Sequence, residues 1–252
     1  MPPPVDRNEI HLWRASTQLS TTTPSDLEAL LSNEERARAR QYRRDIDRTR
    51  YVASHAMSRL VLSRYVGVPP DALTFSVGTQ GKPKLECDSN SPIFFNLSHS
   101  GDLALLAISW DRAVGVDIEE IKNDVDVPAL ALAVLSESEL RMLHAAPAGA
   151  QRGLFFGLWV RKEAVLKACG LGLTVEPRRV EITENVPVGD GSAVTVLPDG
   201  NPTNWGVREV EVGDRYAAAV AAPGKGWLLR CFQHRWSKFS LAPAHPGQER
   251  HS

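Results

Sequence analysis

The stretch Phe156-Gly-Leu-Trp-Val-Arg-Lys-Glu-Ala-Val-Leu-Lys167 decides the fold, because it predicts an apolar helix that carries charged residues on its inner side. Trp159, Glu163 and Lys167 recur every four residues, so they lie along one face of this helix. Glu163 is then either half of an i,i+4 ion pair with Lys167, which contributes only a few tenths of a kcal/mol, or a ligand. Lys162 is five positions from Lys167, so it points about 140° away, toward another surface.

A second pair of carboxylates lies upstream, in Gly115-Val-Asp-Ile-Glu119, which reads as a strand. Asp117 and Glu119 share one side of it because strand side chains alternate. Alternation alone would make this side a solvent face. Held beside Glu163 in a solvated cleft, however, the carboxylates would repel one another unless a cation lies between them. Magnesium suits oxygen ligands and phosphate, whereas no His/Cys set here suits zinc.

The totals bound the class of protein. The chain has 252 residues, of which 42% are hydrophobic, enough for one large domain or two small ones. A net charge of -1 and a pI near 6.7 give no general attraction to nucleic acid. Its three cysteines lack paired or metal-type spacing, and neither a signal peptide nor a membrane span is evident. We therefore expect a soluble, reduced, cytoplasmic protein that binds neither membrane nor nucleic acid.

Along the chain, helices and strands alternate as in an α+β protein. Capping boxes at Ser32–Glu35 and Ser136–Glu139 predict helix starts, and a long helix is expected from Asp47 to Val66. Strands are expected at Ile10–Arg14, Leu73–Val77, Ile93–Leu97, Leu103–Ser109, Val114–Ile118, Val180–Ile182 and Tyr216–Ala221. Residues 238–252 read as a disordered tail.

The two halves of the chain show a similar order of elements. Each runs through a helix, a glycine (Gly67, then Gly172), a proline-containing turn, a strand, a Gly-Asp pair and an apolar strand. Chance is the alternative explanation, since this order is common. The favoured interpretation is a pseudo-twofold pair of similar α+β subdomains, residues 9–120 and 121–233, with the active site in the cleft between them.

Several polar segments are candidates for binding phosphate. Asn96-Leu-Ser-His-Ser100 follows an apolar strand, and Gly81-Lys-Pro83 places a lysine on a rigid turn. Arginines are dense from Arg36 to Arg50, which indicates either a solvated helix face or a local anionic partner. No P-loop is present. A Ser98–His99–Asp117 hydrolase triad is disfavoured because adjacent residues of a strand point apart.

Four segments, at residues 81–83, 95–99, 115–119 and 159–167, together resemble the 4'-phosphopantetheinyl transferase superfamily in order and spacing. The last two resemble its signature motifs, and the resemblance runs from about residue 32 to 222. The length and the two-copy order resemble the surfactin-type branch, which implies a monomer. The resemblance implies transfer of 4'-phosphopantetheine from coenzyme A to a serine of an apo acyl, peptidyl or polyketide carrier protein, with release of adenosine 3',5'-bisphosphate.

The resemblance also implies roles for single residues. Asp117, Glu119 and Glu163 would bind magnesium, and Lys167 would contact the transferred phosphate. A carboxylate near the serine can take its proton, and Glu163 is the candidate, either directly or through a metal-bound water. The remaining coenzyme A contacts would come from Lys82, Ser98, His99, Arg38 for the 3'-phosphate and, less securely matched, Arg50. The loop from Lys122 to Pro128 would dock the carrier protein.

Two other functions compete with this one. A catalytically silent coenzyme A or carrier-protein binding module would not need the whole set of Asp117, Glu119, Glu163 and Lys167. A different metal-dependent phosphotransferase on a similar scaffold would use the same residues on another substrate. The native carrier, whether for fatty-acid, polyketide or nonribosomal-peptide synthesis, is left open.

Overall fold

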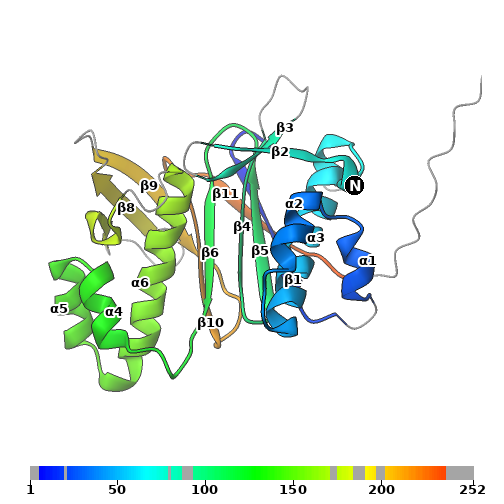
Figure 1. Ribbon diagram of the computed structural model, residues 1–252. Helices are drawn as coiled ribbons and strands as arrows, with labels where there is room; N and C mark the ends of the chain where they lie inside the picture. The colour runs from blue at the N-terminus through cyan, green and yellow to red at the C-terminus, as the bar shows by residue number, and fades with distance from the viewer. Residues whose placement is uncertain are drawn as a thin grey trace, which may run out of the picture.

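The computed structural model describes residues 6–19, 22–78, 81–86, 93–170, 175–183, 191–196 and 202–236. It is an α+β fold, as expected, built from two packed sheets with helices on their outer faces (Figure 1). In its described part, no helix combines the length and apolarity needed to cross a membrane. Residues 238–252, which were expected to be disordered, and Gly172, which was expected to be the equivalent of Gly67, lie outside the described residues.

The first sheet has the strand order β11-β1-β5-β4. Its strands are β1 (Glu9–Ser16), β4 (Phe94–Ser100), β5 (Leu103–Ser109) and β11 (Leu228–Gln233), and only the β1–β11 pair is parallel. The second sheet is antiparallel, with the order β6-β10-β9-β8-β7. Its strands are β6 (Gly115–Glu120), β7 (Val180–Thr183), β8 (Gly191–Val196), β9 (Pro202–Glu209) and β10 (Tyr216–Pro223). A separate hairpin joins β2 (Thr74–Val77) to β3 (Pro83–Glu86).

Two 22-residue helices cover the outer faces of the sheets, α3 (Asp45–Val66) on the first and α6 (Ala148–Cys169) on the second (Figure 1). Both end in a left-handed glycine, Gly67 with φ 73° and Gly170 with φ 67°, a conformation that glycine adopts without steric cost. The shorter helices are α1 (Pro24–Glu28), α2 (Asn33–Ala39), α4 (Val127–Val134) and α5 (Glu137–Ala145), with 3-10 turns η1 (Pro70–Ala72) and η3 (Pro177–Arg179).

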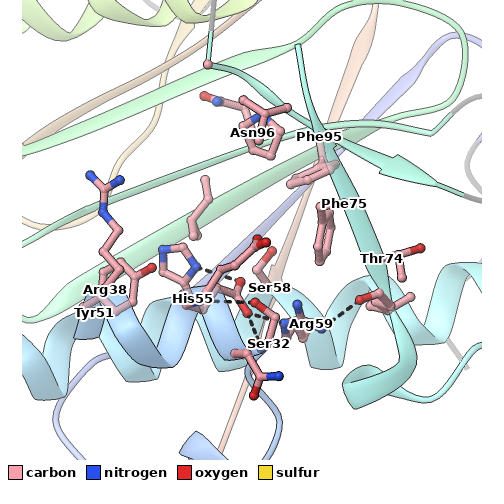
Figure 2. A pocket seen from close by; sticks show the side chains of 18 of the residues that line it. Ser32, Arg38, Tyr51, His55, Ser58, Arg59, Thr74, Phe75, Phe95 and Asn96 are labelled. Atoms are coloured by element: carbon pink, nitrogen blue, oxygen red, sulfur yellow. Dashed lines mark hydrogen bonds and ion pairs between the residues drawn. The ribbon is translucent and has the colours of Figure 1, made fainter. Parts of the chain in front are cut away.

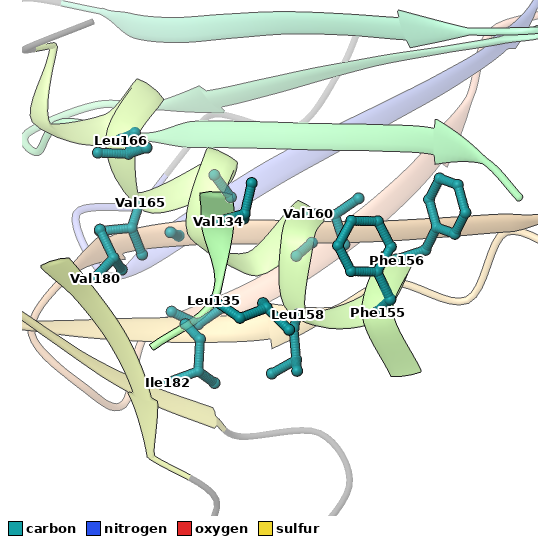
Figure 3. Packing of buried hydrophobic residues seen from close by; sticks show 14 of the residues in the cluster. Val134, Leu135, Phe155, Phe156, Leu158, Val160, Val165, Leu166, Val180 and Ile182 are labelled. Atoms are coloured by element: carbon teal, nitrogen blue, oxygen red, sulfur yellow. The ribbon is translucent and has the colours of Figure 1, made fainter. Parts of the chain in front are cut away.

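The hydrophobic core is divided by these layers. Ile10 and Leu105 of the first sheet meet Val116 and Val220 of the second, which holds the two sheets face to face. Outside them, the apolar side of α6 packs on the second sheet and on α4 and α5 (Figure 3). The Cβ of an alanine at Gly115 would lie 2.0 Å from the carbonyl oxygen of Ala164, so β6 and α6 touch backbone to backbone.

Each half of the chain builds a similar ion pair beside its long helix. In the first, Glu35 from the capping box of α2 accepts from Arg59 Nε at 2.7 Å, and Arg59 also donates to the carbonyls of Pro70 and Leu73. In the second, Glu139 from the capping box of α5 lies 2.7 Å from Lys162 Nζ. Lys162 likewise donates to the carbonyls of Pro177 and Val180, at the start and end of the matching 3-10 turn.

The sheets also cross the expected division of the chain. Strand β6, at the end of residues 9–120, pairs with β10 of the second sheet. Strand β11, at the end of residues 121–233, pairs with β1 of the first. Each half therefore contributes its last strand to the other sheet, and a boundary at residue 120 stays a prediction.

Most of the expected elements form, with small shifts at their ends. The helix expected at Asp47–Val66 starts two residues earlier, and the strand expected at Leu103–Ser109 has those bounds. Strand β3 and helix α4 were not predicted, and their first residues occupy positions read as turn and loop. No bounds were predicted for β8, β9 and β11. Lys162 does point away from Lys167, but into the core with no exposed surface, so its expected place at another surface is wrong.

Candidate active site

The centre of the candidate site is a cluster of three side chains from three elements. Lys167 Nζ on α6 lies 2.5 Å from Asp117 Oδ1 on β6, and 3.1 Å from Ser98 Oγ on β4. Ser98 itself donates to Asp117 Oδ1 at 3.0 Å. The structure thus brings together three of the residues that the sequence singled out. Lys167 pairs with Asp117. The i,i+4 ion pair with Glu163 within α6, which was the alternative interpretation of Glu163, is therefore not the main interaction of Lys167.

Strands β4 and β6 meet through side chains where the two sheets adjoin. Asn96, Ser98 and Ser100 alternate along β4 and face β6. Asn96 Oδ1 accepts from the backbone N–H of Val116 at 2.8 Å, and Ser100 Oγ donates to Glu119 Oε2 at 2.9 Å. These hydrogen bonds hold the carboxylates of β6 against the first sheet. Asn96, Ser98 and Ser100 of β4 bind Val116, Asp117 and Glu119 of β6, respectively.

The carboxylates carry an electrostatic cost. Asp117 is buried, with 3% of its surface exposed, whereas Glu119 and Glu163 are partly buried. Burial raises the pKa of Glu119 and of Glu163, and the neighbouring charge of Asp117 raises both further. The expectation that all three lie in a solvated cleft is therefore wrong for Asp117, which is part of the packed junction.

The donor set fits a divalent cation in its chemistry. Asp117 Oδ2 is buried and has no hydrogen-bond partner among the described residues, which leaves one carboxylate oxygen of the cluster available as a ligand. Glu119 and Glu163 are near enough to Asp117 for its charge to raise their pKa. As they stand, no three Asp, Glu, His or Cys side chains of the described ranges converge closely enough to enclose a metal ion. An ion at this point would have to draw the carboxylates together.

A cavity of about 820 Å³ opens on the other side of β4, between that strand, α2, α3 and the β2–β3 hairpin (Figure 2). Arg38 of α2 and His99 of β4 line it, together with the aromatic side chains of Tyr42, Tyr51, Phe75 and Phe95. Burial lowers the pKa of His99 to about 4, helped by the positive charges of His55, Lys167 and Arg50. His99 is therefore neutral at pH 7 and can donate to a phosphate only through a ring N–H.

The wall of this cavity carries a charged network that sequence reasoning did not assign. Glu35 Oε1 lies 3.1 Å from His55 Nδ1, and its Oε2 accepts from Arg59 (Figure 2). These contacts, with the backbone N–H of Ser32, overcome the effect of burial and lower the pKa of Glu35 to about 2. His55 also stacks on Tyr51 with ring centroids 4.0 Å apart.

Two residues expected at the coenzyme have other partners in this structure. Arg50 donates to Asp102 Oδ1 at 2.9 Å, and it does not line the cavity. The ammonium of Lys82 donates to the backbone carbonyls of Val114, Lys167 and Ala168. Burial lowers the pKa of Lys82 to about 8, so its amine is protonated in most molecules at neutral pH.

Sequence reasoning missed how Asn96 and Ser100 act, although a signal was present. Polar residues at every second position of an otherwise apolar strand indicate that one of its faces meets polar groups. The partners lie about twenty residues away on β6, and only the packing of the two sheets identifies them. Asp102, the partner of Arg50, belongs to the Gly-Asp pair noted in the first half of the chain, and no contact was assigned to it.

Comparison with known proteins places the chain in a family. A family model described as 4'-phosphopantetheinyl transferase superfamily matches residues 113–221, and one described as 4'-phosphopantetheinyl transferase, N-terminal, matches residues 13–111. The 4'-phosphopantetheinyl transferase HetI of a Nostoc species is 33% identical over 222 residues, which cover 87% of this chain and 90% of the relative. The chain belongs to the 4'-phosphopantetheinyl transferase superfamily.

A second relative supports this assignment. The 4'-phosphopantetheinyl transferase psf-1 of Bacillus pumilus is 35% identical over 69% of this chain and 71% of the relative. A crystal structure of a holo-(acyl-carrier-protein) synthase from Bacillus anthracis, in complex with coenzyme A (3',5'-ADP), matches 45% of this chain and 96% of that chain, at 18% identity. Its TM-score of 0.34 is too low to carry an argument. This transferase is an enzyme, and the activity that the sequence predicted, transfer of phosphopantetheine from coenzyme A to a carrier protein, is confirmed at the level of the family.

Proposed function

We propose that this transferase moves the 4'-phosphopantetheine group of coenzyme A to a serine of an acyl, peptidyl or polyketide carrier protein at the Lys167–Asp117–Ser98 cluster. The observation that carries the proposal is the position of this cluster on one side of β4 while the cavity lined by Arg38 and His99 lies on the other. His99 and Ser98 are neighbours on that strand. The charge of Lys167 also lowers the pKa of His99, so the two groups lie close together, and we place the pyrophosphate of a coenzyme in the cavity between them.

The reaction needs a cation, a base and a contact to the transferred phosphate. The serine oxygen forms a bond to the β-phosphorus of coenzyme A, the bond from that phosphorus to the bridging oxygen breaks, and adenosine 3',5'-bisphosphate leaves. Magnesium held by Asp117, Glu119 and Glu163 would supply positive charge that neutralises the pyrophosphate. Lys167 binds the transferred phosphate through its ammonium, which strengthens as charge develops there.

Glu163 is the proposed acceptor of the serine proton. It lies on the same face of α6 as Lys167 and is partly buried, and it would take the proton directly or through a water on the magnesium ion. General base catalysis of this kind is worth roughly 10²–10⁴ in rate.

The two halves of the chain support a two-copy, surfactin-type arrangement as part of the proposal. The matching ion pairs of Arg59 and Lys162, and the left-handed glycines that end α3 and α6, occur at equivalent places in each half. With both copies on one chain, a single chain supplies both sides of the site. We therefore propose that it acts as a monomer.

The function is tested by weighing an apo carrier protein after incubation with the enzyme, coenzyme A and magnesium. We expect the carrier to gain the mass of one phosphopantetheine group, and to gain none when EDTA replaces magnesium. The variant Lys167→Ala should lose turnover far more than affinity for coenzyme A, as for a contact made mainly in the transition state. Binding of coenzyme A without any gain in carrier mass would identify a silent binding module instead.

A separate prediction concerns Arg38. Its guanidinium lines the cavity and suits the two oxygens of a phosphate better than a point charge does. We expect Arg38→Ala to raise the KM for coenzyme A by about tenfold, equivalent to about 1.4 kcal/mol. With dephospho-coenzyme A as donor, the same change should have little effect, because the 3'-phosphate is already absent.

The matched control is Arg40→Ala. Arg40 caps the C-terminal end of the same helix, is exposed and does not line the cavity. Its KM should stay within about twofold of the parent for both donors. An equal penalty for Arg38→Ala with both donors would place Arg38 against the carrier protein.

A further inference from the structure

Lys82 lies in the turn before β3 and reaches across to the two elements that carry the reactive cluster. Its ammonium donates to the carbonyl of Lys167 at 2.7 Å, to that of Val114 at 2.9 Å and to that of Ala168 at 3.4 Å. A lysine ammonium has three hydrogens, so these carbonyls match its whole donor capacity. Lys82 is therefore occupied by backbone and not directed toward the cavity, although its neighbours Gly81 and Pro83 line it.

The three carbonyls lie where α6 and β6 converge. Two of them belong to the last turn of α6, which leaves its final carbonyls without partners inside the helix. A cation at this end is favoured by the helix dipole. The stem of Lys82 also passes Gly170, since the Cβ of an alanine there would lie 3.6 Å from its Cδ. Lys82 is thus a cap on α6 supplied by a hairpin far away in the sequence.

Both ends of Lys167 are held as a result. Its carbonyl accepts from Lys82, and its ammonium pairs with Asp117 Oδ1 at 2.5 Å. Val114, the acceptor outside α6, lies just before β6 and precedes Asp117 by three residues. Lys82 therefore ties together the backbone on both sides of the Lys167–Asp117 pair. The β2–β3 hairpin that carries it forms part of the cavity wall.

We propose that Lys82 is a positioning residue, which holds the last turn of α6 against the start of β6 so that Lys167 and Asp117 keep their reactive geometry. This role goes beyond the phosphate contact that the family resemblance implies for Lys82. It rests on the proposed roles of Lys167 and Asp117, and a misplacement of about 1 Å at such a site can cost roughly a hundredfold in rate.

The test compares Lys82→Met, which keeps the stem and removes the donors, with Lys82→Arg, which restores charge and donors. We expect Lys82→Met to lower kcat by roughly tenfold to a hundredfold while the KM for coenzyme A changes by less than about twofold. Lys82→Arg should recover most of the loss. Lys84→Met is the matched control, since Lys84 lies two residues away on β3, is exposed and does not line the cavity. It should resemble the parent.

Two further measurements separate positioning from other roles. Hydrogen exchange of the amides of residues 166–170 should be faster in Lys82→Met, because the cap on that turn is lost. When Lys167→Ala is already present, adding Lys82→Met should lower kcat further by less than about twofold. The effects of two substitutions are not additive when one residue acts through the other.

Other outcomes would overturn the inference. A raised KM with an unchanged kcat would make Lys82 a phosphate contact, and faster exchange with unchanged kcat would make it a purely structural cap. Full additivity with Lys167→Ala would show that it acts elsewhere. If Lys167→Ala alone leaves transfer intact, the proposed active site is wrong. Hydrogen exchange in Lys82→Met separates this failure from a failure of the present inference, because it reports on the cap of α6 without depending on activity.

Discussion

Replacing Asp117 by asparagine is expected to lower kcat for transfer by roughly 10²–10³ while the fold stays intact. Asparagine keeps the shape of the side chain and an acceptor for Ser98. It removes the negative charge that pairs with Lys167 at 2.5 Å and that would bind magnesium. Asparagine is preferred to alanine because Asp117 is buried, so alanine would also leave Ser98 and Lys167 without their partner. The measurement is steady-state transfer to an apo carrier, with urea unfolding to verify stability.

Asp111→Asn is the control for this prediction. Asp111 lies six residues earlier, is exposed and pairs only with its neighbour Arg112 within the described ranges. Its kcat should equal that of the parent. Near-normal turnover of Asp117→Asn, or a requirement for zinc in place of magnesium, would show that the cluster has been assigned wrongly.

The second large effect concerns stability. Lys162→Met should lower the free energy of unfolding by about 3–5 kcal/mol, because it leaves the carboxylate of Glu139 buried without its cation. The two side chains are 0% and 1% exposed, and their atoms lie 2.7 Å apart. Turnover of the enzyme that remains folded should change little, since Lys162 points away from Lys167. Urea unfolding and transfer assays on the same preparations measure both quantities.

A double variant sharpens this test. Adding Glu139→Gln to Lys162→Met removes the unpaired charge while keeping an acceptor for the N–H of Ile182, so part of the lost stability should return. Arg178→Ala breaks the exposed pair of Arg178 and Glu176 and should cost less than about 1 kcal/mol. A loss as small for Lys162→Met as for Arg178→Ala would mean that the buried pair contributes nothing to folding.

The equivalent pair in the first half is not sealed in the same way. Arg59 and Glu35 sit in the wall of the cavity together with His55, whereas Lys162 and Glu139 are enclosed by α5, α6 and the turn before β7. A similar arrangement of residues therefore serves packing in one half and lines a cavity in the other. In the first half, the hairpin of β2 and β3 lines this cavity beside α3.

The sequence by itself determined the local elements and the identities of the charged residues. Capping boxes at Ser32 and Ser136 set helix starts through hydrogen bonds between residues only three positions apart, so these helix starts could be predicted directly from the sequence. Alternation placed Asp117 and Glu119 on one side of a strand, and the four-residue spacing put Glu163 and Lys167 on one face of a helix. The motifs were also sufficient to identify the family.

Only the tertiary structure decided which of these groups meet. The pairing of Lys167 with Asp117, the contact of Ser98 with both, and the capping of α6 by Lys82 join residues that are far apart in the chain. The burial of Asp117 and Lys162 depends on how the sheets and helices pack, and neither periodicity nor composition contains that information. Local hydrogen bonds and side-chain periods are properties of short segments, whereas burial and long-range ion pairs arise when segments pack together.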